Sequence, residues 1–245
     1  MVRALLLAAG LGTRLAPITN SVPKCLVEIE GRPLLSYWLE LLYDGGLRDI
    51  LINLHYLPDL VRNYIASSPY AGNITTVYED KLLGTAGTLL NNKAFFNGGP
   101  AMLVHADNLT LFDLQSFVAR FETRTPNIDI TMMTFRTDAP ETCGIVELDH
   151  DGVVQAFHEK VKNPPGNLAN AAVYILAPSV MTFIESLGKD VVDFSTEVLP
   201  RYIGRINTFE NEIYHRDIGT VESLAAARLE YPPIAARAKA RLGSK

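Results

Sequence analysis

The pattern of apolar and polar residues changes about halfway along the chain. In the first half, apolar runs without polar alternation, typical of strands buried on both faces, are separated by segments with apolar residues at helical spacing. We expect a first strand in the run that begins at Val2, further strands at 49–54, 74–78 and 101–104, and helices at 33–42, 58–66, 85–92 and 113–122. This alternation predicts an α/β fold with a parallel sheet, helices on both faces and ligands beyond the carboxyl ends of the strands.

The second half contains more closely spaced strand patterns. We expect strands at 128–135, 144–148, 153–159, 171–176, 206–209 and 213–215, a hairpin turn at 149–152, and helices at 178–187, 196–203 and 220–229. Asp193 or Ser195 is expected to cap the helix at 196–203. The tail after Pro232 is expected to form another short, peripheral helix. Since the sequence shows no linker or repeat, we predict one domain over 1–245 with two halves, 1–125 and 126–245.

Composition narrows the class of protein. The chain has 245 residues, 48% of them hydrophobic, and a formal net charge of −5, which is typical of a globular protein and argues against a nucleic-acid-binding surface. No apolar run approaches the length of a membrane span, and the N-terminus lacks the pattern of a signal peptide. The two cysteines, Cys25 and Cys143, form no disulfide framework or zinc pattern. We therefore expect a cytoplasmic protein without nucleic-acid or membrane partners.

The first apolar run leads into a glycine-containing loop. Small residues such as Gly10 and Gly12 let backbone amides form a concave nest that suits phosphate, and two cations, Arg14 and Lys24, follow in the same loop. The spacing does not fit a P-loop, and Leu15 stands where a dinucleotide fingerprint needs its third glycine. The residues therefore indicate a polyphosphate site of another kind, although a tight turn with surface charges would explain a bare Gly-x-Gly equally well.

The whole stretch from Gly10 to Lys24 resembles the signature of the sugar-phosphate nucleotidylyltransferases (NDP-sugar pyrophosphorylases), Gly-x-Gly-Thr-Arg-Leu-x-Pro-x-Thr-x-x-x-Pro-Lys. Every fixed position of that signature is matched, and one neighbour, Cys25, replaces a frequent proline. The resemblance implies a Rossmann-like fold with a mixed, mainly parallel sheet, and a transfer from an NTP to a sugar 1-phosphate that releases pyrophosphate. It makes the first half nucleotide-binding and the second half sugar-phosphate-binding. Longer family members carry a C-terminal left-handed β-helix, which we do not expect here.

The resemblance also assigns roles within the signature loop. Arg14 would bind the leaving β- and γ-phosphates, and Lys24 would bind the α-phosphate. The backbone around them would contact the nucleotide through Leu7, Ala8, Ala9, Gly10, Gly12 and Thr13.

Two aspartates match the positions at which family members hold a divalent metal. Asp107 follows the strand expected at 101–104, and Asp217 opens a late Asp-x-Gly at Gly219. Taken alone, each has an ordinary explanation as a turn or cap residue. With the resemblance, they are expected to bind Mg²⁺, a hard ion that prefers carboxylate, phosphate and water oxygens.

The remaining contacts with the substrates follow from three shorter matches. Glu79, Gly84 and Thr85 lie in a stretch that resembles the base-recognition loop of the mannose- or heptose-1-phosphate guanylyltransferases, and a carboxylate suits the donor groups of guanine. Residues that match the sugar-phosphate site are Gly144, Glu159, Lys160 and Asn170. Ala172 replaces a usual glycine there, which leaves the identity of the sugar open.

The best reading is therefore an enzyme that uses GTP with mannose 1-phosphate or a manno-heptose 1-phosphate. UTP, then dTTP or CTP, follow in the order of preference, and an amino sugar is an alternative acceptor. A regulatory module that binds nucleotide sugars without turnover is the second class. A nicotinamide-dependent oxidoreductase is disfavoured by Leu15 and by the Arg14 and Lys24 pair. The sequence leaves the oligomeric state open, with a homo-oligomer among the options.

Overall fold

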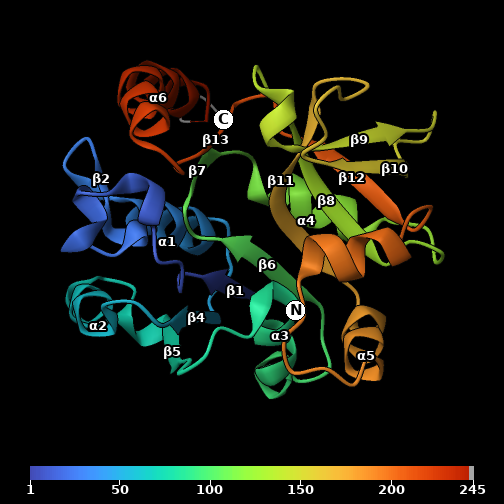
Figure 1. Ribbon diagram of the computed structural model, residues 1–245, viewed down its shortest axis with the longest axis horizontal. Coiled ribbons are helices and arrows are strands. Elements are labelled where there is room, and N and C mark those ends of the chain that lie inside the picture. Colours follow the sequence, from blue (N-terminus) through green and yellow to red (C-terminus); the bar gives the residue numbers. More distant parts are fainter. Residues whose placement is uncertain (243–245) are drawn as a thin grey trace. The chain divides into compact units, whose positions relative to one another are not determined.

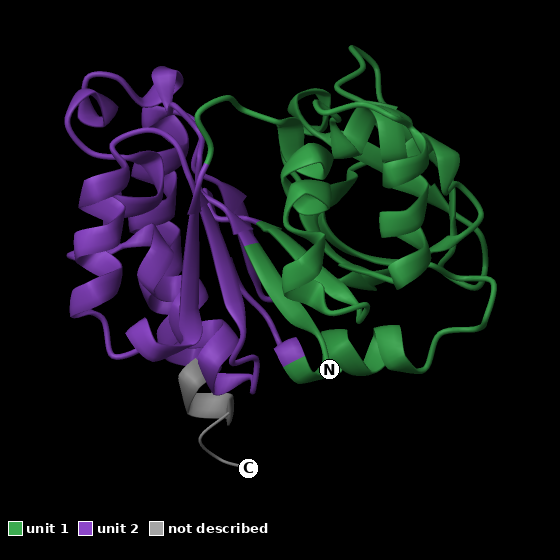
Figure 2. Ribbon diagram, turned by 90° about the horizontal axis from the view of Figure 1, so that it is seen from below, with its two compact units in different colours: residues 1–5, 79–104, 115–210 green, residues 6–78, 105–114, 211–245 purple. Residues whose placement is uncertain are grey.

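The computed structural model describes residues 1–242, and its chain divides into two compact units (Figure 2). Unit 1 comprises residues 1–5, 79–104 and 115–210, and unit 2 comprises residues 6–78, 105–114 and the chain from 211 onward. Two of the boundaries fall inside strands, β1 (Arg3–Leu7) and β6 (Ala101–His105). The predicted single domain with its division at residue 125 stays a prediction.

Unit 2 is an α/β layer with two small ribbons (Figure 1). Its part of β1 is followed in the sheet by β4 and β5, which pair in parallel, and the ribbons β2–β3 and β7–β13 are antiparallel. The elements are β2 (Glu28–Ile29), β3 (Arg32–Pro33), α1 (Leu34–Asp44), β4 (Ile50–Leu54), α2 (Pro58–Ser67), β5 (Ile74–Tyr78), β7 (Asn108–Leu111), β13 (Tyr214–Asp217) and α6 (Val221–Leu242).

One apolar cluster joins distant parts of unit 2. Leu15 from the signature loop, Ile218 after β13 and Leu224 on α6 are almost fully buried in it. Burial of a leucine-sized side chain contributes about 1.5–3 kcal/mol. The loop that carries Arg14 and the segment that carries Asp217 are therefore anchored in the same core.

Unit 1 is a mixed sheet in the strand order β10-β9-β11-β6-β1, with β8 paired to β11 and β12 paired to β8. The β12–β8 pair is parallel, whereas β11 runs antiparallel to its neighbours β6, β8 and β9. Its elements are α3 (Gly84–Asn91), β6, α4 (Leu114–Glu122), β8 (Ile130–Arg136), β9 (Gly144–Leu148), β10 (Val154–Glu159), β11 (Leu168–Leu176), α5 (Pro178–Ser186) and β12 (Ile206–Glu210).

The α/β fold with a mixed sheet flanked by helices is confirmed. Most expected elements lie within a few residues of their predicted bounds, but the short strands β2, β3 and β7 were not predicted. The expected turn at 149–152 joins the antiparallel strands β9 and β10. No helix within residues 1–242 is long and apolar enough to cross a membrane.

Two expected helices differ from the structure. The helix predicted at 196–203 is a turn of π-helix over Phe194–Val198 followed by a 3₁₀ turn over Leu199–Arg201. Pro200 has no N–H to continue a regular helix, and Asp193 caps the segment as predicted, accepting from the Thr196 amide at 2.9 Å.

The tail after Pro232 is helical as expected, but it forms no separate helix, because α6 continues through both prolines to Leu242. Tyr231 is buried in the apolar cluster of unit 2, and Ile234 and Ala235 pack against the same cluster. Tertiary contacts on both sides of the prolines thus offset the backbone hydrogen bonds that proline removes.

Candidate active site

The signature loop is fixed at its start by a buried asparagine. The Ala8 amide donates to Oδ1 of Asn53 at 2.8 Å, and Asn53, on β4, is only 2% exposed. This amide is already satisfied, so a phosphate would meet amides further along the loop. The expected nest therefore begins after Ala8.

Gly12 is required by the packing of the loop itself. It has a φ of 66°, and a Cβ there would lie 2.8 Å from Cγ2 of Thr19. The Thr19 hydroxyl donates to the Gly12 carbonyl at 2.7 Å, and the Tyr56 hydroxyl donates to the Thr19 carbonyl at 2.9 Å. Gly10, in contrast, has no protein atom within 4 Å of the place where a Cβ would stand. The space beside Gly10 is open to a ligand.

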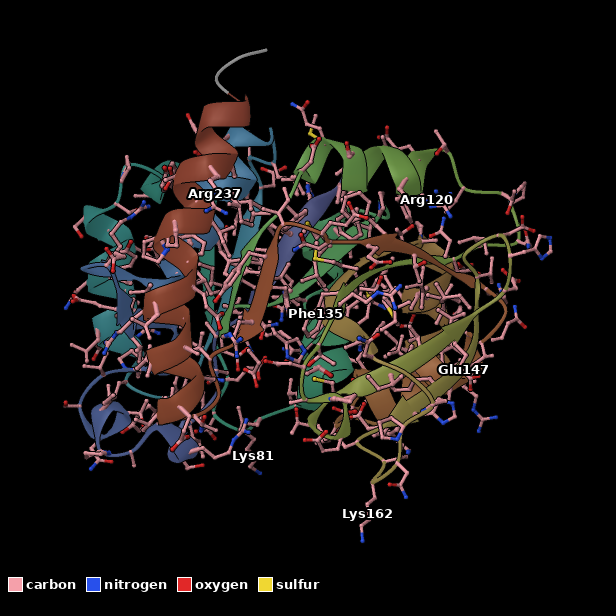
Figure 3. All side chains as sticks on the ribbon, turned by 90° about the horizontal axis from the view of Figure 1, so that it is seen from above. Lys81, Arg120, Phe135, Glu147, Lys162 and Arg237 are labelled. Atoms are coloured by element: carbon pink, nitrogen blue, oxygen red, sulfur yellow. The ribbon has the colours of Figure 1, made fainter. Side chains whose placement is uncertain are left out.

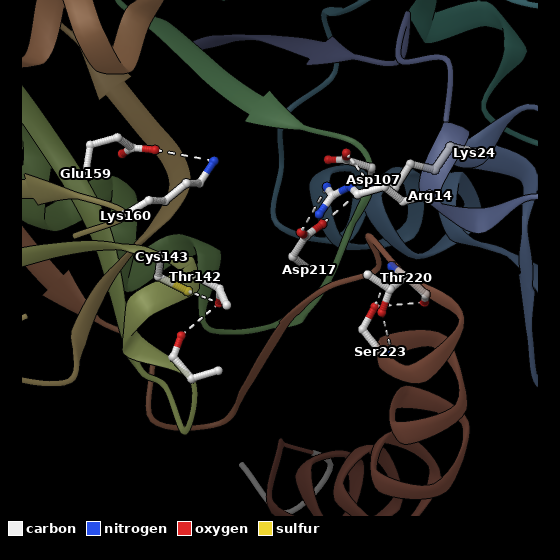
Figure 4. Close-up of polar contacts among 11 residues, drawn as sticks. Arg14, Lys24, Asp107, Thr142, Cys143, Glu159, Lys160, Asp217, Thr220 and Ser223 are labelled. Carbon is white, nitrogen blue, oxygen red and sulfur yellow. Dashed lines mark hydrogen bonds and ion pairs between the residues drawn. The ribbon is translucent and has the colours of Figure 1, made fainter. Parts of the chain in front are cut away.

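The expected catalytic residues of unit 2 come together around one lysine (Figure 4). The Lys24 side chain is only 8% exposed, and its Nζ lies 2.5 Å from Oδ2 of Asp107 and 3.4 Å from Oδ1 of Asp217. Arg14 is 68% exposed, and its Nη2 lies 4.0 Å from Oδ2 of Asp217. The arrangement is a buried cation between two carboxylates, with a second, exposed cation at the solvent side.

The β7–β13 ribbon brings the two aspartates together. Asp217 pairs with Asn108 in this ladder, next to Asp107, and the Ile218 amide donates to the Asp107 carbonyl at 3.2 Å. A Cβ at Gly219 would lie 2.7 Å from Oδ2 of Asp217 and 2.9 Å from Nη2 of Arg14. The glycine of the Asp-x-Gly therefore leaves room for both charged groups.

Burial and nearby charge shift the pKa values of groups in and around this cluster. Burial would raise the pKa of Asp107, but the positive charges of Lys24 and His105 outweigh it and hold that pKa below its ordinary value. Burial lowers the pKa of His215 to about 3 and raises that of the Cys25 thiol to about 12. The carboxylate is thus ionised near neutral pH, while the imidazole and the thiol carry no charge.

A pocket with about 190 Å³ of open space adjoins this cluster. It lies entirely within unit 2 and is lined by Leu7, Ala8, Gly10, Lys24, Cys25 and Asp107. The Cys25 side chain is buried and neutral, so the residue that departs from the family signature supplies part of the pocket wall and no charge.

Asp107 and Asp217 have the chemistry to hold a hard divalent cation. One ammonium group contacts an oxygen of each, so both carboxylates face a common point at which positive charge is stabilised. Carboxylate oxygens are the protein ligands that Mg²⁺ prefers. The described residues contain no group of three or more candidate ligands, so a metal held there would need water or phosphate oxygens as well.

In unit 1, the expected base-recognition loop is hydrogen-bonded to the backbone of Val192 and Phe194. Gly84 has a φ of 74°, and a Cβ there would lie 2.5 Å from the Val192 carbonyl oxygen, which accepts from the Ala86 and Gly87 amides at 3.0 and 3.1 Å. The Thr85 hydroxyl accepts from the Phe194 amide at 2.7 Å. These groups support the loop.

Glu79 lies just after β5 and is 5% exposed. Its carboxylate is therefore largely withdrawn from solvent, and its predicted contact with the base stays a prediction.

The expected sugar-phosphate residues of unit 1 lie partly on the β9–β10 hairpin. Gly144 pairs with Glu159 across the ladder, and a Cβ at Gly144 would lie 2.6 Å from the Phe157 ring and 2.7 Å from Oε2 of Glu159. Lys160 follows with a φ of 50°, its amide donates to the Cys143 carbonyl at 3.1 Å, and its Nζ lies 3.4 Å from Oε1 of Glu159. Gly144 thus makes room for the adjacent carboxylate, and the Lys160 ammonium remains exposed.

Asn170 lies at a bulge in β11. Its Nδ2 donates to the Tyr174 hydroxyl at 2.6 Å, and its Oδ1 accepts from the Ala172 amide at 2.9 Å. Ala172 has a φ of 53°, a left-handed conformation that explains the glycine usual at this position. Asn170 therefore holds the bulge with part of its hydrogen-bonding capacity.

Sequence reasoning missed Asn53 and Tyr56, which fix the signature loop. It matched Thr19 and Gly219 to family motifs but did not assign the packing role of Thr19 or the steric role of Gly219. Asn53 was detectable in principle, because it is a polar residue within the otherwise apolar strand Ile50–Leu54. Tyr56 becomes visible only through its distant partner, the Thr19 carbonyl.

Comparison with known proteins places this geometry in a family context. The profile described as "Nucleotidyl transferase" matches residues 3–232. The chain is 29% identical over 252 residues to a probable mannose-1-phosphate guanylyltransferase 1 from Oryza sativa subsp. japonica, covering 99% of this chain and 68% of the relative. It is 30% identical over 233 residues to mannose-1-phosphate guanyltransferase 2 from Candida glabrata, covering 92% of this chain and 63% of the relative. The chain thus spans about two thirds of the length of these curated relatives.

The chain is also similar to a solved structure over most of its length. HddC from Yersinia pseudotuberculosis, complexed with GMP-PN, is similar with a TM-score of 0.78 and 27% identity, covering 94% of this chain and 100% of that chain.

Proposed function

Because the chain belongs to the nucleotidyl transferase family, we propose that it joins a nucleoside triphosphate to a sugar 1-phosphate and releases pyrophosphate. The proposed substrates are GTP and mannose 1-phosphate or a manno-heptose 1-phosphate. The names of the curated relatives and the guanine nucleotide complex of HddC support this choice. An oligomeric state, a cytoplasmic location and the lack of nucleic-acid or membrane partners stay predictions.

The observation that carries the proposal is the convergence of Lys24, Asp107 and Asp217 beside the open space at Gly10. A protein that merely bound a nucleotide would not need two carboxylates beside its phosphates, because unneutralised carboxylates repel them. Paired with a lysine and a metal, the same carboxylates suit phosphoryl chemistry, in which catalysis depends on positioning and charge stabilisation.

In the proposed reaction, an oxygen of the sugar phosphate attacks the α-phosphorus of the triphosphate. The bond from that phosphorus to the bridging oxygen breaks, and pyrophosphate leaves with the electron pair. The attacking oxygen is already an anion, so no side chain needs to act as a general base. We assign Lys24 to the α-phosphate, Arg14 to the leaving phosphates and Lys160 to the phosphate of the acceptor.

The metal proposed for this site is Mg²⁺, which Asp107 and Asp217 would hold and which would screen the repulsion between the two substrate anions. Arg14, whose side chain is exposed, would neutralise charge that accumulates on the leaving group. Nucleotide contacts are proposed for the backbone from Leu7 to Thr13, and those made by amides come from residues after Ala8, whose amide already donates to Asn53.

The test is a matrix of nucleoside triphosphates against sugar 1-phosphates with Mg²⁺ present, scored by released pyrophosphate and by the nucleotide sugar formed. We expect turnover only when both substrates are present, and most turnover with GTP and a manno-configured acceptor. Reactions that lack the sugar phosphate control for simple hydrolysis. No pyrophosphate in any pair would overturn the enzymatic proposal, and equal rates with pyrimidine nucleotides would overturn the guanine assignment.

A further inference from the structure

Lys24 occupies the point at which the proposed metal would bind. Its ammonium contacts one oxygen of Asp107 and one of Asp217, and the side chain is almost fully buried. Mg²⁺ needs oxygen ligands at about 2.0–2.1 Å. An ammonium group within hydrogen-bond distance of both carboxylates and a divalent cation bound to the same two carboxylates would therefore repel each other at close range.

The burial of Lys24 distinguishes this contact from ordinary surface ion pairs. An exposed lysine can swing into water at little cost, whereas a buried ammonium that loses its anionic partners leaves an uncompensated charge. Lys93, paired with Glu185 on the surface of unit 1 with side chains 53% and 56% exposed, is an ion pair of the ordinary kind.

We infer that Lys24 is the built-in counter-ion of the two carboxylates, and that it keeps a divalent metal out of the site until a nucleotide phosphate draws the ammonium away. Because the described residues contain no group of three or more candidate ligands, Asp107 and Asp217 alone would give a free metal ion too few ligands to displace the lysine. A nucleotide supplies both a new anionic partner for Lys24 and further oxygen ligands for the metal. The metal therefore enters together with the nucleotide.

This inference rests on the proposed function only for the step in which a nucleotide releases Lys24. The counter-ion role itself depends on the structure without a ligand. Arg14 is free to meet the phosphates first, because it is exposed and stands 4.0 Å from Asp217, so Lys24 and Arg14 have separate tasks.

The experiment measures Mn²⁺ binding by electron paramagnetic resonance in the absence of nucleotide, for the wild type and for Lys24→Met. Methionine has a similar length and no charge. We expect Lys24→Met to bind Mn²⁺ about ten-fold more tightly or better, a difference large enough to measure reliably. Mn²⁺ should also raise the melting temperature of Lys24→Met and leave that of the wild type unchanged, because ligand binding stabilises the folded state.

Three further variants make the result specific. Lys93→Met removes the same charge at the ordinary surface pair and should bind Mn²⁺ like the wild type. Lys24→Met combined with Asp107→Asn should lose the gain, since a carboxylate ligand is missing. Lys24→Gln serves the same comparison should the methionine variant not fold.

Equal Mn²⁺ affinity of the wild type and the folded Lys24 variant would overturn the inference, as would a gain that survives the loss of Asp107. A second arm adds a GTP analogue that cannot be cleaved, which should raise Mn²⁺ binding by the wild type to the level of Lys24→Met. If the analogue binds without that rise, release by nucleotide is wrong. Failure of the pyrophosphate assay would leave the nucleotide-free comparison untouched, so the two proposals can fail separately.

Discussion

The candidate residues of the two units are held in different ways. In unit 2, Lys24 and Asp107 are fixed by burial, by a direct ion pair and by the β7–β13 ladder. In unit 1, Lys160 is 66% exposed and its nearest carboxylate, Glu159, lies 3.4 Å away. Lys24, proposed to act on the reacting phosphate, is thus held by burial and ion pairs, whereas Lys160, proposed to bind the acceptor, is exposed to solvent.

The supporting residues differ in the same sense. Around the loop that carries Lys24 they are polar groups that tie distant segments, such as Asn53 and Tyr56. At the β11 bulge, the Asn170 side chain makes its hydrogen bonds within its own strand, with Ala172 and Tyr174. The comparison predicts large losses of turnover from changes in unit 2 and smaller, more specific effects from changes in unit 1.

The largest effect is expected for Lys24→Met. Loss of one preorganised charge contact commonly reduces turnover by about 10²–10³-fold, and here the removed charge also balances two carboxylates. Steady-state pyrophosphate release should show the fall mainly in kcat, while circular dichroism shows a folded protein. The control is Lys93→Met. Turnover close to wild type would remove Lys24 from the proposed mechanism.

Gly219→Ala should give the next largest effect. The added methyl would meet Asp217 and Arg14 at 2.7 and 2.9 Å, and misplacement of a catalytic group by about 1 Å can cost on the order of 10²-fold in rate. We expect a drop of about ten- to a hundred-fold with little change in melting temperature. Gly72→Ala is the matched control, because a Cβ at Gly72 meets no atom within 4 Å. Equal activity of the two variants would contradict the steric role.

Lys160→Ala should weaken the binding of the sugar 1-phosphate without affecting that of the nucleotide. Loss of a charged hydrogen bond costs about 1.5–3 kcal/mol, which corresponds to about ten-fold or more in affinity. We expect a higher KM for the sugar 1-phosphate and an almost unchanged KM for the nucleotide. Lys162→Ala, whose side chain extends outward from the same loop in Figure 3, tests the specificity of the effect. A similar rise for Lys162→Ala would show that only the general charge of the loop matters.

Ala172→Gly should produce the smallest effect, and it should stabilise the fold. A left-handed backbone conformation costs a non-glycine residue about 1–2 kcal/mol, and glycine would relieve this strain. Part of the resulting stabilisation is lost because glycine has greater conformational freedom in the unfolded chain. We expect the free energy of unfolding in urea to rise by about 0.5–1 kcal/mol. Ala171→Gly, at a buried neighbour on the same strand, should lower it. A destabilised Ala172→Gly protein would show that the methyl packs favourably in the bulge.

The sequence by itself determined the order of most strands and helices, because apolar spacing is a property of neighbouring residues. The predicted strand at 74–78 and the helix begun at Pro58 agree with β5 and α2. It also identified the signature loop, whose residues lie next to one another in the chain.

Only the tertiary structure decided how the chemical groups meet. Lys24 reaches Asp107 and Asp217 across 83 and 193 residues of sequence, and the Ala8 amide that a nest would use is taken by Asn53 on another strand. The continuity of α6 through Pro232 depends in the same way on Tyr231 and its neighbours in the core. Local patterns encode local conformation, whereas burial, ion pairing and steric clearance depend on partners that folding alone brings together.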